Sequence, residues 1–458
     1  MDGQNPRDSV MLTPMENEDQ PRSYKETPKD EPEYRRAPKD RFGLVTIIFI
    51  FQGLGTLYPW NSFITAERYF TDHKFANVSD SVDFKDNFTL YVAFGNFTPY
   101  IFFLFLSLFF PTRTSKIWCF AGLVMMFFLF IITTFLAILD TSQWPEMFFW
   151  ITMITIVLFS ASAAIYQSGL YCLLAKLPPN YIQSYLVGQG FGGTFVAIAA
   201  IISIAIAGTQ RSAAVGYFTT AVVVLFICIV FYCLLYKMTM VKYHLGVARG
   251  NEAADEINKA ASGLVDNSSR SQCCLTSINL AQIFWDIKMQ IFNIWMTFFV
   301  TLSLFPGVLV EIQSSNDHKS EFLDLYFTPL VCFLTFNFGD FLGSLIPGIP
   351  RLRWKFPRLT WIWVTLRLVF VIFIFCNYRP DRRTLPIWID NDIGYAILVV
   401  IFSLSNGYLK TIIMMDGPSS VSNPTWASKA ASMMAFFLIL GIFCGVQFSR
   451  FFPWIVTI

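Results

Sequence analysis

Three charged side chains stand inside long apolar runs of the sequence, where charge is rare. Asp340 lies in LTFNFGDFLGS, Arg367 in WVTLRLVF and Lys410 in SNGYLKTII. A charge in the middle of a membrane-spanning helix costs about 2.5–3.5 kcal/mol, so these residues are expected to have a function. Asp340 could contact a solute or pair with a basic neighbour, whereas a pairing role is favoured for Arg367. Lys410 could contact a solute or extend toward the membrane surface.

Uncharged polar and aromatic side chains also stand within these runs. Trp60 and Asn61 follow Pro59 in the first run, and the others are Gln167 in the fourth run, Asn337 in the eighth and Asn406 in the tenth. Trp60 could anchor its helix at the membrane surface, but its depth in the run favours a position facing a cavity. Buried amides such as Gln167 commonly bond to a neighbouring helix, so that structural role stays open.

Enzymatic chemistry finds little support in these residues. An intramembrane aspartyl protease needs two aspartates, and Asp340 has no counterpart inside another run. The three histidines, His73, His244 and His318, lie in polar segments, which excludes a proton relay within the membrane. The motif H-E-x-x-H is absent, and GQGFGG at 188–193 lacks the lysine of a phosphate-binding loop. The sequence therefore predicts no catalytic residue, no metal site, no cofactor and no enzyme.

The composition identifies the class of protein that must position these residues. Of 458 residues, 55% are hydrophobic and only 14% are charged, against roughly 25% in soluble domains. Residues 1–41 alone hold eight basic and ten acidic side chains, so the rest of the chain is poorer in charge still. The sequence contains no cluster of basic residues of the kind that binds nucleic acid, so no nucleic-acid partner is predicted. We predict an all-α polytopic membrane protein in a lipid bilayer, with a disordered cytoplasmic tail at 1–41.

Eleven apolar stretches are long enough to span a membrane. They lie at about 42–66, 90–110, 117–139, 147–174, 185–207, 213–236, 290–312, 325–346, 359–377, 393–415 and 430–452. A polar stretch at 237–289 separates six spans from five and is predicted to be a cytoplasmic loop. This layout is typical of transporters built from two bundles, here 42–236 and 290–458, with the substrate between them.

The basic residues of the loops predict the orientation. With the N-terminus in the cytoplasm, the inner loops hold 14 lysines and arginines and the outer loops eight. Basic loops tend to stay in the cytoplasm, which predicts a cytoplasmic N-terminus and an extracellular C-terminus. Asn77 and Asn87 then begin N-x-S/T motifs in the first outer loop, so both are predicted glycosylation sites. The plasma membrane is the expected location, with an intracellular membrane as the alternative.

Glycines within the spans predict close contacts between helices. The first span contains two of them, and pairs spaced four residues apart occur in the fifth and eleventh spans. Small residues at this spacing let helix backbones approach closely. The predicted packing residues are Gly53, Gly55, Gly188, Gly192, Gly441 and Gly445.

Several motifs, in the same order, resemble those of the equilibrative nucleoside transporters. They are GLGTLYPWNSFITAERYF at 53–70, FLTFNFGDFLG at 333–343, SNGYLKT from 405 with a later GP, and MAFFLILGIFCG at 434–445. The resemblance, to animal members in particular, covers the membrane region but not the tail or the central loop. It implies a facilitative carrier with a fold like that of the major facilitator superfamily, in a 6 + 5 arrangement.

The resemblance also implies roles for individual residues. Leu57 and Trp60 would line the cavity beside the nucleobase, and Gln167 would hydrogen-bond the base. Asp340 would accept from the ribose hydroxyls. An amide both donates and accepts, so Gln167 could contact purines and pyrimidines alike. The complete set predicted to bind substrate is Leu57, Trp60, Asn61, Phe97, Gln167, Phe305, Asn337, Asp340, Lys410 and Ile442.

One position departs from the pattern of the family. Members usually have arginine four residues after this aspartate, and here that residue is Ser344. Lys410 stands where a small residue would be more usual. Our hypothesis is that Lys410 supplies the positive charge that Asp340 would otherwise lack.

The predicted function is facilitative transport of purine and pyrimidine nucleosides by alternating access, with no obligate protein partner. The two bundles would pivot about a central site. Flux would follow the substrate gradient, since the sequence shows no energy source. Two alternatives stay open: transport of organic cations such as monoamines, with Asp340 facing the cation, and proton-coupled nucleoside transport through Asp340.

Overall fold

A backbone buried in lipid must satisfy its hydrogen bonds internally, which favours helices wherever the chain is apolar for about 20 residues. The computed structural model describes residues 38–66, 69–75, 88–109, 115–141, 143–205, 210–261, 269–314, 326–378 and 385–457. Within them, β-type pairing is limited to two isolated bridges, Ile312 with Tyr378 and Cys376 with Ile389. The predicted all-α fold is confirmed. Residues 1–38 and 39–458 form separate units, and the second is described below.

Eleven described segments are helical, long and apolar enough to cross a membrane, as the sequence predicted. The α-helices are α1 (Leu44–Thr65), α3 (Phe88–Ser107), α4 (Ser115–Ile138), α5 (Pro145–Leu174), α6 (Asn180–Ala205), α7 (Gln210–Leu235), α8 (Thr239–Ala261), α9 (Ser269–Leu304), α10 (Gly307–Val310), α12 (Thr335–Leu345), α13 (Thr360–Leu366), α14 (Asp392–Asp416), α15 (Ala427–Ser449) and α16 (Phe451–Thr457). Other helical segments are η2 (Tyr69–Lys74), η4 (Thr328–Leu334), η7 (Arg367–Phe375) and η9 (Pro424–Trp426). The eighth span joins η4 to α12, and the ninth joins α13 to η7.

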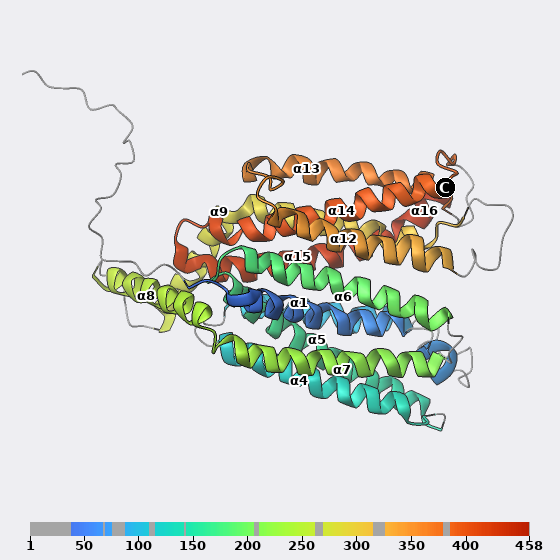
Figure 1. Ribbon diagram of the computed structural model, residues 1–458, viewed down its shortest axis with the longest axis horizontal. Helices are drawn as coiled ribbons and strands as arrows, with labels where there is room; N and C mark the ends of the chain where they lie inside the picture. Colours follow the sequence, from blue (N-terminus) through green and yellow to red (C-terminus); the bar gives the residue numbers. More distant parts are fainter. Residues whose placement is uncertain are drawn as a thin grey trace, which may run out of the picture. The chain divides into compact units, whose positions relative to one another are not determined.

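The polar stretch at 237–289 contains regular structure. It holds α8 and the beginning of α9, and the seventh span starts at Leu280 rather than near 290. Figure 1 shows α8 beyond the end of the bundle at which α1 begins, with the C-terminus at the opposite end. The predicted glycosylation sites Asn77 and Asn87 lie outside the described residues.

Helices of the first six spans pack mainly with one another, and so do those of the last five. In the first set α1 contacts α6 and α7, and α5 contacts α3 and α4; in the second α9 contacts α15, and α12 contacts α14. The two sets, called here the first and second bundles, meet where α6 contacts α12 and where α15 contacts α3 and α5. A site between the bundles would therefore be bounded by these helices.

Glycines stand where α1 crosses its neighbours. A Cβ added to Gly53 would lie 2.0 Å from the carbonyl oxygen of Tyr185, and one added to Gly188 would lie 2.0 Å from that of Ile50. At Gly55 the added atom would be 2.5 Å from a cysteine sulfur of α7. Gly192 is less crowded, at 3.2 Å from the nearest atom of α1. No larger residue fits the tightest of these crossings without moving a backbone.

The second bundle has comparable crossings. Cβ atoms at Gly441 and Gly445 would lie 2.5 and 2.6 Å from carbonyl oxygens of α9. In α12, a Cβ added to Gly339 would lie 2.0 Å from Oγ of Ser403, and one added to Gly343 would lie 2.3 Å from the carbonyl oxygen of Leu404, both in α14. Gly339 and Gly343, spaced four residues apart, bring the backbone on either side of Asp340 against α14.

Candidate functional site

The carboxylate of Asp340 is buried between α12 and α14. Its Oδ2 forms an ion pair with Nζ of Lys410. Its Oδ1 accepts a hydrogen bond of 2.7 Å from Nδ2 of Asn406. Asp340 is 7% exposed and Lys410 5%, so both charges are shielded from solvent and lipid. The structure thus brings the positive charge of Lys410 onto Asp340, as the hypothesis drawn from the sequence required.

Further polar groups continue from this pair into α9. Oγ1 of Thr301 donates to Oδ1 of Asn406 at 2.7 Å. One turn earlier in α9, the carbonyl oxygen of Thr297 accepts from Nη1 of Arg367 at 2.9 Å. All of these residues are buried. Buried contacts therefore join α9, α12, α14 and η7 into one polar network, defined here as Asp340, Lys410, Asn406, Thr301 and Arg367.

Arg367 is held by groups other than the carboxylate. Its Nε donates to Oγ of Ser405 at 3.1 Å, and its Cζ lies 5.0 Å from the ring centre of Phe402. Its Nη2 has no hydrogen-bond partner among the described residues. These contacts fasten η7 to α14 and α9, so Arg367 has structural contacts, but its described partners are a hydroxyl and a carbonyl oxygen rather than the opposite charge that the sequence favoured.

Ser344, at the position where the resemblance led us to expect arginine, supplies no charge. Its hydroxyl donates to the carbonyl oxygen of Asp340 at 2.8 Å, one turn earlier in α12. A Cβ added to Gly407 would lie only 2.0 Å from the same oxygen, so α12 and α14 touch at this level. Lys410 is three residues beyond Gly407. The cation therefore comes from the neighbouring helix rather than from the next turn of α12.

Asp340 lies close to the face of α12 that meets the first bundle. Cβ atoms added to Gly193 and Gly190 of α6 would lie 2.1 Å from Oδ1 of Asn337 and 2.8 Å from Cα of Phe341. Residues three apart on a helix are neighbours on its surface, so Asn337 and Asp340 are adjacent. The charged pair therefore stands beside the contact between the two bundles.

In the first bundle, the amide of Gln167 is buried between α5 and α3. Its Oε1 accepts a hydrogen bond from the hydroxyl of Tyr100. One turn further along α5, the hydroxyl of Tyr171 has no partner among the described residues. The ring of Tyr171 lies 5.2 Å from that of Tyr185 in α6. This region offers an amide and phenol hydroxyls, which are neutral groups that both donate and accept.

Aromatic side chains connect the two bundles. The ring centres of Trp60 and Phe97 are 5.5 Å apart, and those of Phe97 and Phe443 are 6.4 Å apart. This series runs from α1 through α3 to α15. In the second bundle, Phe305 stacks on Phe336 with a centre-to-centre distance of 3.8 Å. The first series thus crosses the contact between the bundles, whereas the stacked pair belongs to the core of the second bundle.

The remaining predicted residues make fewer polar contacts. Leu57 and Asn61 are half-buried on α1, and Ile442 is half-buried on α15. Asn337 uses its Nδ2 to donate to the carbonyl oxygen of Phe333 at 2.8 Å. The structure thus places Asn337 at a contact between helices, with part of its bonding capacity used locally.

Comparison with known proteins identifies the family. A model of the nucleoside transporter family matches residues 153–454. This chain belongs to that family. It is 32% identical to human equilibrative nucleoside transporter 1, over 92% of this chain and 99% of that protein. It is 30% identical to human equilibrative nucleoside transporter 2, over 91% of this chain and 98% of the relative.

The fold of this nucleoside transporter family member is also found among solved structures. The major facilitator superfamily proton:xylose symporter XylE aligns with a TM-score of 0.53, covering 90% of this chain and 87% of the other. At 13% identity the similarity shows the fold alone. The expected major-facilitator fold is confirmed. The expectation that the chain is not an enzyme is confirmed as well, because its relatives are transporters.

Two sets of polar contacts join the bundles at the α8 end of this transporter fold. Sγ of Cys172 lies 3.0 Å from Oγ of Ser432, and Oγ of Ser428 donates to the carbonyl oxygen of Cys172 at 3.0 Å. Nε2 of Gln183 donates to the carbonyl oxygens of Ser344 and Leu345, at 3.0 and 2.9 Å. The first set links α5 to α15 and the second links α6 to α12. We call them together the bundle seam.

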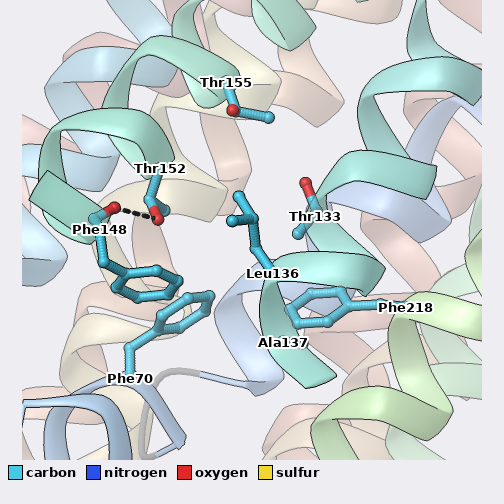
Figure 2. A pocket seen from close by; sticks show the side chains of 8 residues that line it. All are labelled: Phe70, Thr133, Leu136, Ala137, Phe148, Thr152, Thr155 and Phe218. Atoms are coloured by element: carbon cyan, nitrogen blue, oxygen red, sulfur yellow. Dashed lines mark hydrogen bonds between the residues drawn. The ribbon is translucent and has the colours of Figure 1, made fainter. Parts of the chain in front are cut away.

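Figure 2 shows a small cavity in the first bundle. Its volume is about 10 Å³, enough for about one water molecule and far too small for a nucleoside. Its walls are Phe70, Phe148, Phe218, Leu136, Ala137, Thr133, Thr152 and Thr155. The hydroxyl of Thr152 donates to the carbonyl oxygen of Phe148 at 2.8 Å and so is satisfied within its own helix. This cavity is a packing defect rather than a substrate site.

Sequence reasoning missed several polar residues of the site. Tyr100 and Tyr171 accompany Gln167, and Thr301 accompanies Asn406. The signal available for them was weak, because a hydroxyl in an apolar run can bond to its own helix without any function. Only the arrangement of helices shows which hydroxyls meet another polar side chain.

Proposed function

We propose that this protein carries nucleosides across a membrane, down their concentration gradient. Its similarity to equilibrative nucleoside transporters over about nine-tenths of the chain carries this proposal. The polar groups on the two sides of the bundle contact suit such a substrate. A nucleoside is neutral, with a flat base that both donates and accepts and a sugar rich in hydroxyls.

Each bundle supplies groups for one part of the substrate. Gln167 bonds the base, and Trp60 and Phe97 cover its apolar faces. The ribose hydroxyls donate to the carboxylate of Asp340 and accept from Lys410, which remains beside it. The other residues proposed to line the path are Leu57, Asn61, Phe305, Asn337 and Ile442.

Transport follows from a pivoting of the two bundles, 42–236 and 290–458, about this site. The N-terminus and the 237–289 segment face the cytoplasm, and the C-terminus faces outward. Opening toward the cytoplasm requires the bundle seam to separate, which breaks the hydrogen bonds of Cys172 and Gln183. The ion pair with Lys410 occupies Asp340, which favours uncoupled transport over a cycle of protonation at this carboxylate.

We place the protein in the plasma membrane, with Asn77 and Asn87 glycosylated outside. Removing N-linked glycans from intact cells tests both points together. A shift of the protein to lower mass that is lost in an Asn77→Gln, Asn87→Gln double variant supports the assignment. A protein found only on internal membranes overturns it.

Uptake of radiolabelled uridine and adenosine by cells that express the protein tests the function. We expect saturable uptake of both, reduced about tenfold by Gln167→Ala, because a lost hydrogen bond to a buried group costs 1–3 kcal/mol. Gln282→Ala, at an exposed position of α9, is the matched control and should leave uptake unchanged. Absence of nucleoside uptake by surface-expressed protein overturns the proposal. Concentrative uptake by proteoliposomes under a proton gradient would exclude simple facilitation.

A further inference from the structure

Asp340 is the one acidic side chain in the middle of a described membrane span. The other acidic residues of those spans, Glu146, Asp286, Asp392 and Asp416, lie near span ends. A central carboxylate beside the bundle contact would attract a cationic solute if its charge were free. In this protein it is not free, because Lys410 contacts one carboxylate oxygen and Asn406 the other.

The ion pair is a dipole without net charge. A neutral solute with hydroxyl groups can donate to the carboxylate and accept from the ammonium group. An organic cation placed at the carboxylate would stand within a few ångströms of Lys410 and be repelled, because little solvent is present to screen the two charges. Like charges placed side by side in this way are a common means of rejecting a wrong partner.

We propose that Lys410 determines the charge selectivity of the transporter: it admits neutral nucleosides and excludes organic cations. The inference rests on the proposed function, since it assigns a selectivity to the same site. Without the ammonium group, Asp340 becomes an acceptor site for protonated amines and quaternary ammonium ions.

Arg367 cannot replace Lys410 in this role. Its Nε and Nη1 are bonded to Ser405 and to the carbonyl oxygen of Thr297, and its guanidinium packs on the ring of Phe402. Its connection to Asp340 runs through other members of the polar network rather than through a direct contact. The selectivity is therefore assigned to Lys410 alone.

Lys410 also joins α12 to α14, but the two helices have other contacts. Gly339 and Gly343 of α12 lie against α14, and Gly407 of α14 lies against the backbone of Asp340. Loss of the ammonium group should therefore leave the helices packed. Asn406 still donates to the carboxylate in such a variant.

The experiment measures uptake of uridine, serotonin and tetraethylammonium by wild type and by Lys410→Met, corrected for protein at the cell surface. Wild type should take up uridine but neither cation. Lys410→Met should gain uptake of both cations, about tenfold above wild type, because a like-charge contact has been removed. Its uridine uptake should fall. Adding Asp340→Asn to Lys410→Met should abolish the gained cation uptake.

Two further variants keep the test decisive. Lys410→Gln, which can still bond to Asp340, should gain cation uptake even if the methionine variant fails to reach the surface. Lys410→Arg retains the charge and should exclude cations. Lys288→Met makes the same chemical change at an exposed position of α9 and should behave as wild type.

The outcomes separate this inference from the proposed function. Uridine uptake by wild type with no cation uptake by surface-expressed Lys410→Met or Lys410→Gln overturns the role of Lys410 and leaves nucleoside transport intact. Cation uptake by wild type also overturns it. Absence of nucleoside uptake by wild type overturns the proposed function itself.

Discussion

The two bundles stabilise their buried polar groups in different ways. In the first bundle, buried hydroxyl groups donate to neutral amides. The three pairs are Tyr166 with Gln52, Tyr100 with Gln167 and Ser160 with Asn96. In the second bundle the polar network contains a carboxylate and two cations. The same environment thus holds hydrogen-bonded amides on one side and an ion pair on the other.

This difference predicts different responses to mutation. Loss of a neutral hydrogen bond usually costs about 0.5–1.5 kcal/mol. Loss of one member of a buried ion pair costs about 3–5 kcal/mol, because an uncompensated charge stays behind. Single polar substitutions in the first bundle should therefore cost little, whereas removing one charge of the ion pair in the second bundle should cost more than removing both charges together.

The largest effect is expected for Asp340→Asn. This change leaves Lys410 buried at 5% exposure without an acidic partner, so the folded protein should lose about 3–5 kcal/mol. Lys410→Met should cost less, about 1–3 kcal/mol, because Asn406 continues to satisfy the carboxylate. The double variant Asp340→Asn, Lys410→Met should recover most of the stability that Asp340→Asn alone loses. Thermal unfolding in detergent and surface abundance measure these effects.

A first-bundle variant provides the contrast for this cycle. Ser160→Ala removes one neutral hydrogen bond and should cost only about 1 kcal/mol. Strictly additive losses for Asp340→Asn and Lys410→Met would show that the two side chains are not energetically coupled, contrary to the ion pair.

Much of the fold could be predicted from the sequence because the membrane makes the pattern simple. Apolar length alone identified the eleven spans, and the scarcity of charge directed attention to Asp340 and Lys410. The missing arginine at Ser344 suggested their pairing. The sequence could not show that Asn406 and Thr301 extend this pair into α9, because those contacts depend on which helices are neighbours.

Local backbone geometry was less accessible. The ninth span changes from α13 to a tighter helix at Arg367, and the polar stretch at 237–289 forms α8. Neither feature could be predicted from the hydropathy of the sequence. Gly339, Gly343 and Gly407 were not among the predicted packing residues, although they bring α12 and α14 together at the ion pair. These glycines matter because a neighbouring helix packs against them, and the spacing of glycines in the sequence does not show which helix that is.

A smaller effect, shared by both bundles, is expected at the helix crossings. A Cβ at Gly188 would lie 2.0 Å from the carbonyl oxygen of Ile50, and a Cβ at Gly407 would lie 2.0 Å from that of Asp340. Gly188→Ala and Gly407→Ala should each destabilise the protein by about 1–3 kcal/mol, because backbones must move apart. Thermal unfolding measures both.

The matched control is Gly216→Ala, since no atom of the described residues lies within 4 Å of a Cβ at that position. It should leave the melting temperature unchanged or raise it slightly. If Gly188→Ala also left it unchanged, close packing of α1 on α6 would not contribute to stability, and the two bundles would differ in packing as well as in charge.

The smallest effect concerns a cation at the margin of the first bundle. Nζ of Lys74, in η2, donates to the carbonyl oxygens of Leu136 and Leu139 at the end of α4, at 3.1 and 2.6 Å. Burial, which is the largest cause, and the positive charge of Arg211 together lower the pKa of Lys74 to about 8, while the negative charge of Asp140 opposes the shift. In the unfolded chain the pKa of lysine is about 10.4.

This depressed pKa links stability to pH. Between pH values of about 8 and 10.4 the unfolded chain binds more protons at Lys74 than the folded protein does, so the free energy of unfolding rises with pH. Wild type should therefore gain a few degrees in melting temperature relative to Lys74→Met between these values, and nothing at lower pH. Lys288→Met, which removes an exposed charge, should follow wild type. Parallel melting curves for wild type and Lys74→Met would mean that Lys74 is not a buried cation with a lowered pKa, which would sharpen the contrast between the first bundle and the second.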